Sequence, residues 1–251
     1  IIAIAISVAF LAGSAVLVAT EGQAQGKAMN VSLAVADVVV TTPRDGSAKG
    51  VGEAISGTAG VAVAAPVLST TEVVTAGVVS EGISFVNVPP EGLRWASLTA
   101  GRWPSAANEV VLSGGAAGAL GISVGGQLTV SGREQSLSVV GVTDEPSGMF
   151  VKTGYASDAL LTAIGATADN AGYWTVKAKP GVSTDTLVAA LDESLSSLNP
   201  RPSVATASSV REKMVEKLAG DFNVFANVLW AFAGLAVGAA VGAATVYAVK
   251  K

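Results

Sequence analysis

The sequence predicts a membrane protein in which two transmembrane α-helices flank an α+β extracytoplasmic domain. Two stretches without charge, residues 1–20 and residues 222–249, carry the first part of this prediction. About 20 apolar residues of α-helix cross a hydrocarbon core of about 30 Å, so each stretch is long enough to span a bilayer. All 19 acidic residues lie between the two stretches, which predicts that residues 21–221 face water.

The charges at the end of the chain give the orientation. Lys250 and Lys251 directly follow the second stretch, and basic residues beside a membrane helix favour the cytoplasmic side. The domain then lies outside the cytoplasm. Because residue 1 is not Met and the chain stops at the membrane exit, we expect an internal piece of a longer protein. A cleaved signal peptide is the alternative for residues 1–20, although these lack a basic flank and exceed the usual apolar region of about 7–15 residues.

Composition limits the function classes. Residues 21–221 hold 13 bases and 19 acids, a net charge of −6, which disfavours nucleic acid and anionic lipid as partners of this domain. This length suffices for one core or for two small lobes. The chain has neither Cys nor His, so disulfides are excluded and a serine nucleophile would lack its usual base.

The first part of the domain predicts strands around one short helix. Residues 30–42 are rich in Val and alternate imperfectly, which indicates a strand. Turn residues gather at 43–46, and residues 47–57 indicate a short helix. Between 61 and 88 Val is frequent and Gly interrupts it, so we expect several strands before two prolines end the section.

Short elements with tight turns follow. We expect a strand at 109–112 and an Ala-rich helix at 114–120. Residues 127–131 and 135–142 alternate polar and apolar side chains around a Ser-Gly-Arg-Glu turn, which predicts a hairpin. A further helix is expected from a cap at Ser157 to a stop at Gly165.

The last section of the domain alternates strand and helix. Residues 173–179 predict a strand, and residues 183–198 predict a helix that ends before Pro200 and Pro202. A short strand is expected at 203–206. The helix has a leucine stripe on one face, made of Leu187, Leu191, Leu195 and Leu198.

A final helix is expected to lead into the second membrane span. A capping box at residues 209–212 opens it, and Val210, Met214 and Leu218 lie on one face. No Pro interrupts the chain from residue 209 to its end, so a continuous stalk could carry motion across the bilayer. A bend at Gly220 would instead make it a simple tether, and the sequence leaves both interpretations open.

Three glycines in the second span suggest helix packing. Gly234, Gly238 and Gly242 form two overlapping G-x-x-x-G motifs on one helix face. Small residues let helix backbones approach closely in lipid, so we expect a partner helix within the full protein or across a dimer. A chance match in a span rich in Ala and Gly is the alternative.

Several tempting motifs lack their companions. Residues 121–125 match G-x-S-x-G, but without a His we interpret them as a Gly-rich turn. Residues 152–154 match K-T-G by coincidence, since no Ser has Lys three residues later. The adjacent acid pairs at 144–145 and 192–193 lie outside any calcium-loop pattern, so we interpret them as solvated surface. A P-loop motif is missing, so an ATPase would have to be another subunit.

Four short fragments follow one another in the middle of the chain. They are Gly-Arg-Trp-Pro at 101–104, Glu-Val-Val-Leu at 109–112, Leu-Gly-Ile-Ser-Val-Gly at 120–125 after Ala117, and Val-Val-Gly-Val at 139–142. Together they resemble the periplasmic core of FtsX/MacB-like ABC transporter permeases. The order and spacing of the fragments agree with that family, as does a span at each end of the domain. The family often has an acid after the second Gly of the third fragment, where this chain has Gly126 and Gln127.

The resemblance implies a domain of two lobes. A membrane-proximal lobe would comprise residues 30–69 and 173–221, and a second lobe at about 82–151 would be inserted in it. It also implies a multi-pass protein of the bacterial inner or plasma membrane, whose third and fourth spans lie outside this chain. The implied partners are a separate cytoplasmic ABC ATPase, a homo- or heterodimeric permease partner, membrane lipid and an extracytoplasmic protein, with no nucleic acid. No cofactor, metal or catalytic residue is expected here, since ATP and Mg would bind the ATPase.

The function expected from the resemblance is transport. A permease subunit would couple ATP hydrolysis by its ATPase partner to movement of the extracytoplasmic domain, for export or extraction of a lipid, lipoprotein, peptide or drug. The alternative is a two-span membrane-anchored binding or cell-wall-regulating scaffold without transport. An exported enzyme with carboxylate-based glycosidase chemistry is the third possibility. Nothing in the sequence names a substrate.

Overall fold

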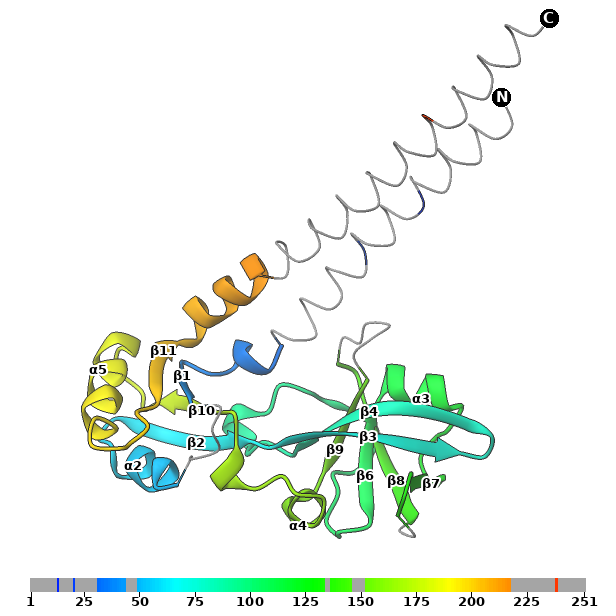
Figure 1. Cartoon of the computed structure of the whole chain (residues 1–251). Helices are drawn as coiled ribbons and strands as arrows, with labels where there is room; N and C mark the ends of the chain where they lie inside the picture. The colour runs from blue at the N-terminus through cyan, green and yellow to red at the C-terminus, as the bar shows by residue number, and fades with distance from the viewer. Residues whose placement is uncertain are drawn as a thin grey trace, which may run out of the picture. The chain divides into compact units, whose positions relative to one another are not determined.

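The chain divides into two compact units, residues 27–212 and residues 1–26 together with 213–251. In the second of these units the described residues are helical. No helix within the described part of the chain is long and apolar enough to cross a membrane. The predicted spans 1–20 and 222–249 lie outside the described residues, except for Gly13, Thr20 and Gly238. The structure is a computed structural model (Figure 1), and it describes residues 13, 20, 31–43, 49–133, 136–145, 152–217 and 238.

A four-stranded antiparallel sheet forms the first lobe of the unit 27–212. Its strands are β1 (Val38–Thr41), β2 (Val61–Val67), β10 (Tyr173–Ala178) and β11 (Ser203–Thr206). They lie in the order β11-β1-β10-β2. Helix α2 (Val51–Gly57) connects β1 to β2, and helix α5 (Thr184–Ser194) connects β10 to β11. Two β-α-β units interleaved in one antiparallel sheet are the ferredoxin-like arrangement.

Both helices cover the same face of this sheet and enclose a core. The predicted leucine stripe is confirmed, because Leu187, Leu191 and Leu195 are fully buried. Helix α5 itself ends at Ser194, before the predicted end, and Ser183 caps its first turn. The rest of this core consists of Val38, Val40, Val51, Ile55, Trp174 and Val176.

A seven-stranded sheet forms the second lobe, which is inserted between β2 and β10. Its strands are β3 (Ser69–Ala76), β4 (Val79–Asn87), β5 (Leu98–Gly101), β6 (Glu109–Ser113), β7 (Gln127–Val130), β8 (Ser136–Thr143) and β9 (Thr153–Ala156). They lie in the order β5-β8-β6-β9-β4-β3-β7, and β7 also pairs with β8. This last pairing closes every strand except β5 into a ring. Closure leaves the strands of the ring without free edges.

Short helices complete the second lobe. Helix α3 (Gly114–Leu120) follows β6 and helix α4 (Asp158–Ala163) follows β9, while two 3-10 helices, η1 (Glu91–Leu93) and η2 (Ala168–Asn170), lie in connections. The predicted cap of α4 is confirmed, because the Ser157 hydroxyl accepts a hydrogen bond from the Leu160 amide. Large buried side chains fill the ring, among them Ile83, Phe85, Leu112, Leu120, Leu128, Leu137, Leu160 and Leu161.

The larger sheet extends beyond the predicted inserted lobe at both ends. It begins at Ser69 and ends at Ala156, whereas the sequence predicted about 82–151. The reason is that β3 pairs with β4 along its whole length, across a two-residue turn. Gly77 adopts a φ of 60° in this turn, which is a conformation that favours glycine.

Two local predictions are corrected. The predicted strand at 30–42 is a strand only at Val38–Thr41, because residues 31–34 are helical; Val-rich segments with imperfect alternation fit either structure. The last helix begins at residue 207 and not at the predicted box of 209–212. Its cap is the hydroxyl of Thr206, which accepts a hydrogen bond from the amide of Ser209 at 3.1 Å.

Candidate functional site

The chain enters and leaves the four-stranded sheet at the same place. Residues 31–37 lead into β1, and the helix that starts at 207 follows β11, which pairs with β1. The carbonyl of Asp37 accepts a hydrogen bond from the amide of Ala207 at 2.9 Å. In Figure 1 the blue segment before β1 accordingly lies beside the start of the orange helix. We call residues 31–37 the entry segment and residues 207–217 the exit helix.

The predicted stalk residues lie on the exit helix as far as the structure describes it. Val210 and Met214 are both partly buried, whereas the next residue, Val215, is about half exposed. Leu218 lies outside the described residues. Val210 and Met214 therefore lie in a helix, and both the shared face and its coupling role stay predictions.

The predicted helix-packing glycines fall mostly outside the described residues. Gly234 and Gly242 are not among them. Gly238 is helical and exposed, and a Cβ added to it would meet nothing within 4 Å. The packing role of this face stays a prediction.

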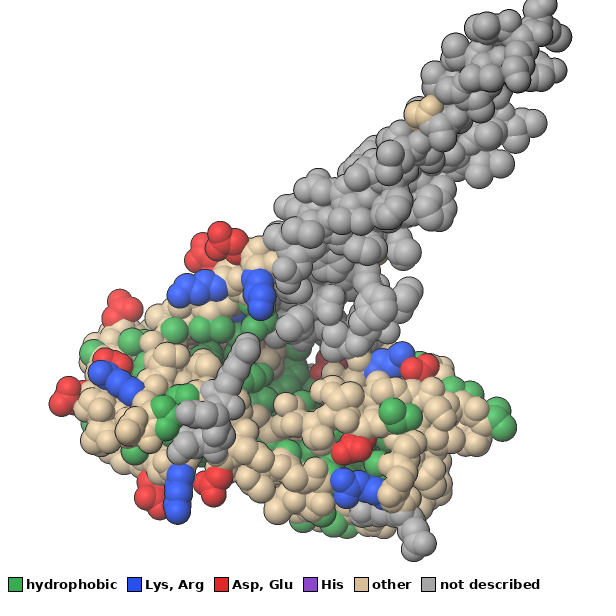
Figure 2. Space-filling model, in the orientation of Figure 1, with side chains coloured by type: hydrophobic (Ala, Val, Ile, Leu, Met, Phe, Trp, Pro, Cys, Tyr) green, Lys and Arg blue, Asp and Glu red, His purple; other side chains and the backbone are tan. Residues whose placement is uncertain are grey.

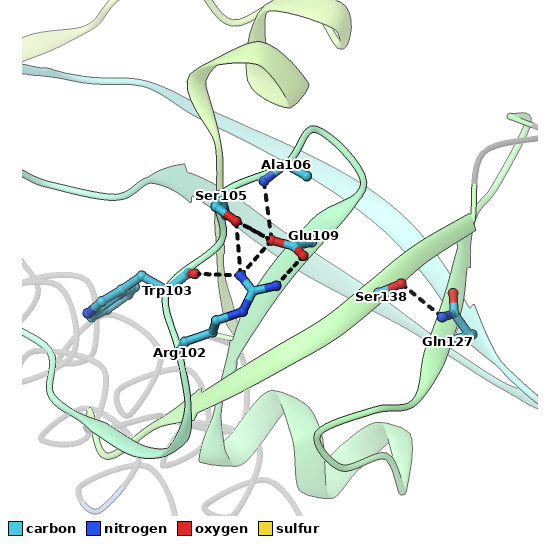
Figure 3. A network of polar contacts seen from close by, with 7 residues as sticks. All are labelled: Arg102, Trp103, Ser105, Ala106, Glu109, Gln127 and Ser138. Atoms are coloured by element: carbon cyan, nitrogen blue, oxygen red, sulfur yellow. Dashed lines mark hydrogen bonds and ion pairs between the residues drawn. The ribbon is translucent and has the colours of Figure 1, made fainter.

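The first two fragments of the resemblance meet in one ion pair, shown in Figure 3. Nη1 of Arg102 donates to Oε2 of Glu109 at 2.7 Å, and Nη2 donates to Oε1. The same carboxylate accepts hydrogen bonds from the amides of Ser105 and Ala106 at 2.8 and 3.2 Å. The hydrogen bond from Arg102, followed by that from Ser105, holds the pKa of Glu109 well below its usual range. These contacts fix the connection between β5 and β6.

The glycines of the resembling fragments are needed for a close approach of two strands. Gly101 has a φ of 77°, and a Cβ there would lie 2.0 Å from the carbonyl oxygen of Val140. A Cβ on Gly141 would lie 2.6 Å from the carbonyl oxygen of Arg102. Gly121, with a φ of 62°, ends α3, which confirms that the G-x-S-x-G match is a turn. These fragments therefore build the fold of the second lobe.

A buried carboxyl lies beside a small aromatic cluster. Glu145 is only 9% exposed, and its Oε2 accepts hydrogen bonds from the Tyr155 hydroxyl and, at 3.3 Å, from Nε1 of Trp95. Its Oε1 is buried and has no hydrogen-bond partner among the described residues. Burial raises the pKa of this carboxyl. The ring of Trp103 packs edge-on against Tyr155, with 5.2 Å between ring centroids.

The interpretation of both acid pairs as solvated surface is wrong for Glu145. Asp144 is exposed and accepts a hydrogen bond from the Ser97 amide, whereas Glu145, which also follows the end of β8, is buried against Trp95 and Tyr155. Asp192 and Glu193 are exposed as expected. The presence of Trp95 and Trp103 close together in a chain with 5% aromatic residues is the signal that could have indicated the cluster.

The described surface carries no obvious reactive centre. Within the described ranges, no three metal-ligating side chains lie close enough together to hold an ion. Figure 2 shows Lys and Arg side chains beside Asp and Glu side chains in several small groups on the face in view, with neutral atoms between the groups. We take the junction of entry segment and exit helix as the candidate functional site, because the two segments meet there in the hydrogen bond between Asp37 and Ala207.

The described domain is α+β and has two lobes, a ferredoxin-like sheet and a strand ring inserted between two strands of that sheet. The entry segment and the exit helix are hydrogen-bonded to each other at Asp37. The chain belongs to the family of MacB-like periplasmic core domains, whose family model matches residues 1–194. This confirms the resemblance that the sequence fragments indicated. No curated protein matches the chain.

Solved structures share the fold. The periplasmic region of MacB from Actinobacillus actinomycetemcomitans matches with a TM-score of 0.55 and 15% identity, over 76% of this chain and 94% of that one. The extracellular domain of the noncanonic ABC-type transporter YknZ from Gram-positive bacteria matches at 0.53 and 15%, over 67% and 98%. A domain of a protein described as a permease from Porphyromonas gingivalis matches at 0.52 and 18%, over 69% and 91%.

Family membership gives the coarse function. The domain is a MacB-like periplasmic core domain, which lies outside the cytoplasm.

Proposed function

We propose that this chain belongs to a multi-pass permease subunit of the bacterial cell membrane that couples ATP hydrolysis by a separate cytoplasmic ATPase to movement of the described domain. The subunit dimerises with a like or related permease, and the movement drives export or extraction of a lipid, lipoprotein, peptide or drug. The chain performs no bond chemistry and binds no cofactor; ATP and Mg bind the ATPase.

The observation that carries this proposal is the hydrogen bond between Asp37 and Ala207 at the sheet edge. A domain attached at two distant points would resist movement of either attachment. Here the two attachments are neighbours, so a displacement of the exit helix acts on the sheet at one place. Exit-helix residues Val210 and Met214, with Leu218 beyond them, are the proposed coupling face, and Gly234, Gly238 and Gly242 the proposed packing face.

Purification of the full-length protein from its native membrane tests the proposal. We expect an ABC ATPase to co-purify, and ATP hydrolysis that vanadate inhibits. Mass spectrometry of the same preparation should identify a co-purified lipid or peptide as the cargo class. A preparation that contains the protein without any ATPase, and that hydrolyses no ATP, would favour the membrane-anchored scaffold instead.

A further inference from the structure

The carboxylate of Asp37 replaces a strand partner at the end of β10. Strand β1 pairs with β10 only as far as Val38 opposite Val176. Beyond this point Oδ2 of Asp37 accepts a hydrogen bond from the amide of Ala178 at 2.9 Å. A side chain therefore continues the contact between entry segment and β10 where the regular ladder has stopped.

The side chain of Lys177 in β10 also binds the entry segment. Its Nζ donates to Oδ1 of Asp37 at 3.2 Å and to the carbonyl of Val35 at 3.0 Å. One ammonium group thus binds both the side chain of Asp37 and the backbone two residues earlier. Because the Lys177 and Asp37 side chains are 41% and 28% exposed, solvent partly screens the attraction between their charges.

The backbone of Asp37 joins three elements. Its amide donates to the carbonyl of Val176 in β10 at 3.0 Å, and its carbonyl accepts from Ala207 in the exit helix. The far end of β10 is also fixed, because the amide of Thr42 donates to the carbonyl of Gly172 at 3.1 Å. Strand β10 therefore runs from the junction of the two segments to the chain that comes from the strand ring.

We propose that Asp37 is a positioning residue that makes the entry segment and the exit helix move as one piece with β10. This inference rests on the proposed function, since it assigns the route by which motion reaches the domain. Asp37 acts through Lys177 and the amide of Ala178, and it contacts no cargo. Without its carboxylate, the entry segment would lose its side-chain contacts with Lys177 and Ala178, and only the backbone hydrogen bonds of residue 37 would still join it to Val176 and Ala207.

Spin labels on the full-length protein in lipid, together with its ATPase, test the inference. The chain has no Cys, so A34C and S208C provide a label pair at two exposed sites on the entry segment and the exit helix. When no other residue is changed, the distribution of distances between the two labels should have one narrow peak. D37A and K177Q should lose that narrow peak, while K177R, which keeps the cation, should restore it. D192N is the matched control, because it breaks an exposed ion pair with Arg201 in the same lobe.

Two further readouts separate positioning from general loss of structure. Hydrogen exchange of the Ala178 amide should be about tenfold faster in D37A than in wild type, while amides of the strand ring are unchanged. A second label pair, S208C with S131C on the turn between β7 and β8, reports whether ATP with vanadate shifts the exit helix relative to the ring. D37A should change this nucleotide-dependent shift, and D192N should not.

The outcomes distinguish the two proposals. If D37A and K177Q keep the narrow A34C–S208C peak and the wild-type response to nucleotide, the positioning role of Asp37 is wrong. If the wild-type protein shows no nucleotide-dependent shift and hydrolyses no ATP, the proposed function fails. The A34C–S208C peak width and the Ala178 exchange rate then still decide whether Asp37 joins the two segments.

Discussion

Arg102 and Glu109 form a bidentate ion pair that joins the two ends of the connection between β5 and β6. Glu109 stands at the first position of β6, and Arg102 directly follows β5. The backbone amide of Arg102 also donates to the carbonyl of Val140 in β8, at 2.9 Å. One arginine therefore links three neighbouring strands of the second lobe. This explains why two of the fragments that carry the family resemblance contain the two members of the pair.

Acidification should weaken the domain through Glu109. Its pKa is lowered in the folded state, so its contribution to stability is present above the unfolded value of about 4.3 and is lost as pH falls through the folded value. We expect E109Q to lose less thermal stability than wild type when the pH is lowered from 5 to 3. Thermal unfolding followed by tryptophan fluorescence measures this, with D192N as an exposed-pair control. Equal losses in E109Q and wild type would contradict the assignment.

Glu145 should respond to pH in the opposite direction. Burial raises its pKa, so the folded state binds this proton more tightly than the unfolded chain does. The wild-type domain then loses stability as pH rises from about 4.3 through the raised value. Gln is neutral throughout and keeps an acceptor for Tyr155 and Trp95. We expect the stability of E145Q relative to wild type to increase over this interval in denaturant titrations. A difference independent of pH would show that the pKa of Glu145 is not raised in the folded state.

Two glycines with nearly equal backbone angles should differ in their tolerance of a methyl group. Gly101 and Gly132 have φ values of 77° and 75°, but only at Gly101 would a Cβ meet backbone atoms, the nearest of them the carbonyl oxygen of Val140. G132A should cost about 1–2 kcal/mol for the left-handed conformation alone. G101A adds a backbone clash, and we expect about 3–5 kcal/mol. Chemical denaturation of both variants checks this, and equal costs would argue against the close approach of β5 to β8.

Asn87 should be essential for the crossing from the first lobe to the second. Its Oδ1 accepts from the Leu68 amide at 3.0 Å, and its Nδ2 donates to the Pro66 carbonyl at 3.1 Å. N87A leaves two backbone groups at a largely buried site without partners, so we expect a loss of about 2–4 kcal/mol in the free energy of unfolding.

Asn170 provides the matched control for this variant. Its side chain accepts a hydrogen bond from the amide of Thr167 and donates one to the carbonyl of Gly165. Both bonds lie at an exposed site, where water can replace the side chain. N170A should therefore cost under about 1 kcal/mol. If both variants lose the same stability, burial at Asn87 does not govern the effect.

Local patterns predicted the elements whose partners are close in sequence. The hairpin of β7 and β8 was predictable because both strands alternate around a short turn, and the pairing of Leu128 with Leu137 confirms it. The stripe of α5 was predictable because Leu187, Leu191 and Leu195 have helical spacing. Both signals depend only on neighbouring residues.

Contacts between distant segments were beyond such patterns. The closure of the ring depends on β7 pairing with both β3 and β8, and nothing in the short strand β7 specifies two partners. Glu145 is buried by Trp95, which is 50 positions away, and Asp37 bonds Ala178 across 141 positions. The start of the exit helix was misplaced for the same reason, since Ala207 takes its partner from Asp37.

Val67 and Tyr173 lie directly opposite each other on adjacent strands. The chain therefore leaves and re-enters the ferredoxin-like sheet at one pair of opposite residues, whatever the length of chain between them. Replacement of the intervening module by that of a relative, or by a tight loop, would leave every residue pair of the four-stranded sheet unchanged. Under the function proposed above, this module can vary with the cargo while the junction of entry segment and exit helix stays constant.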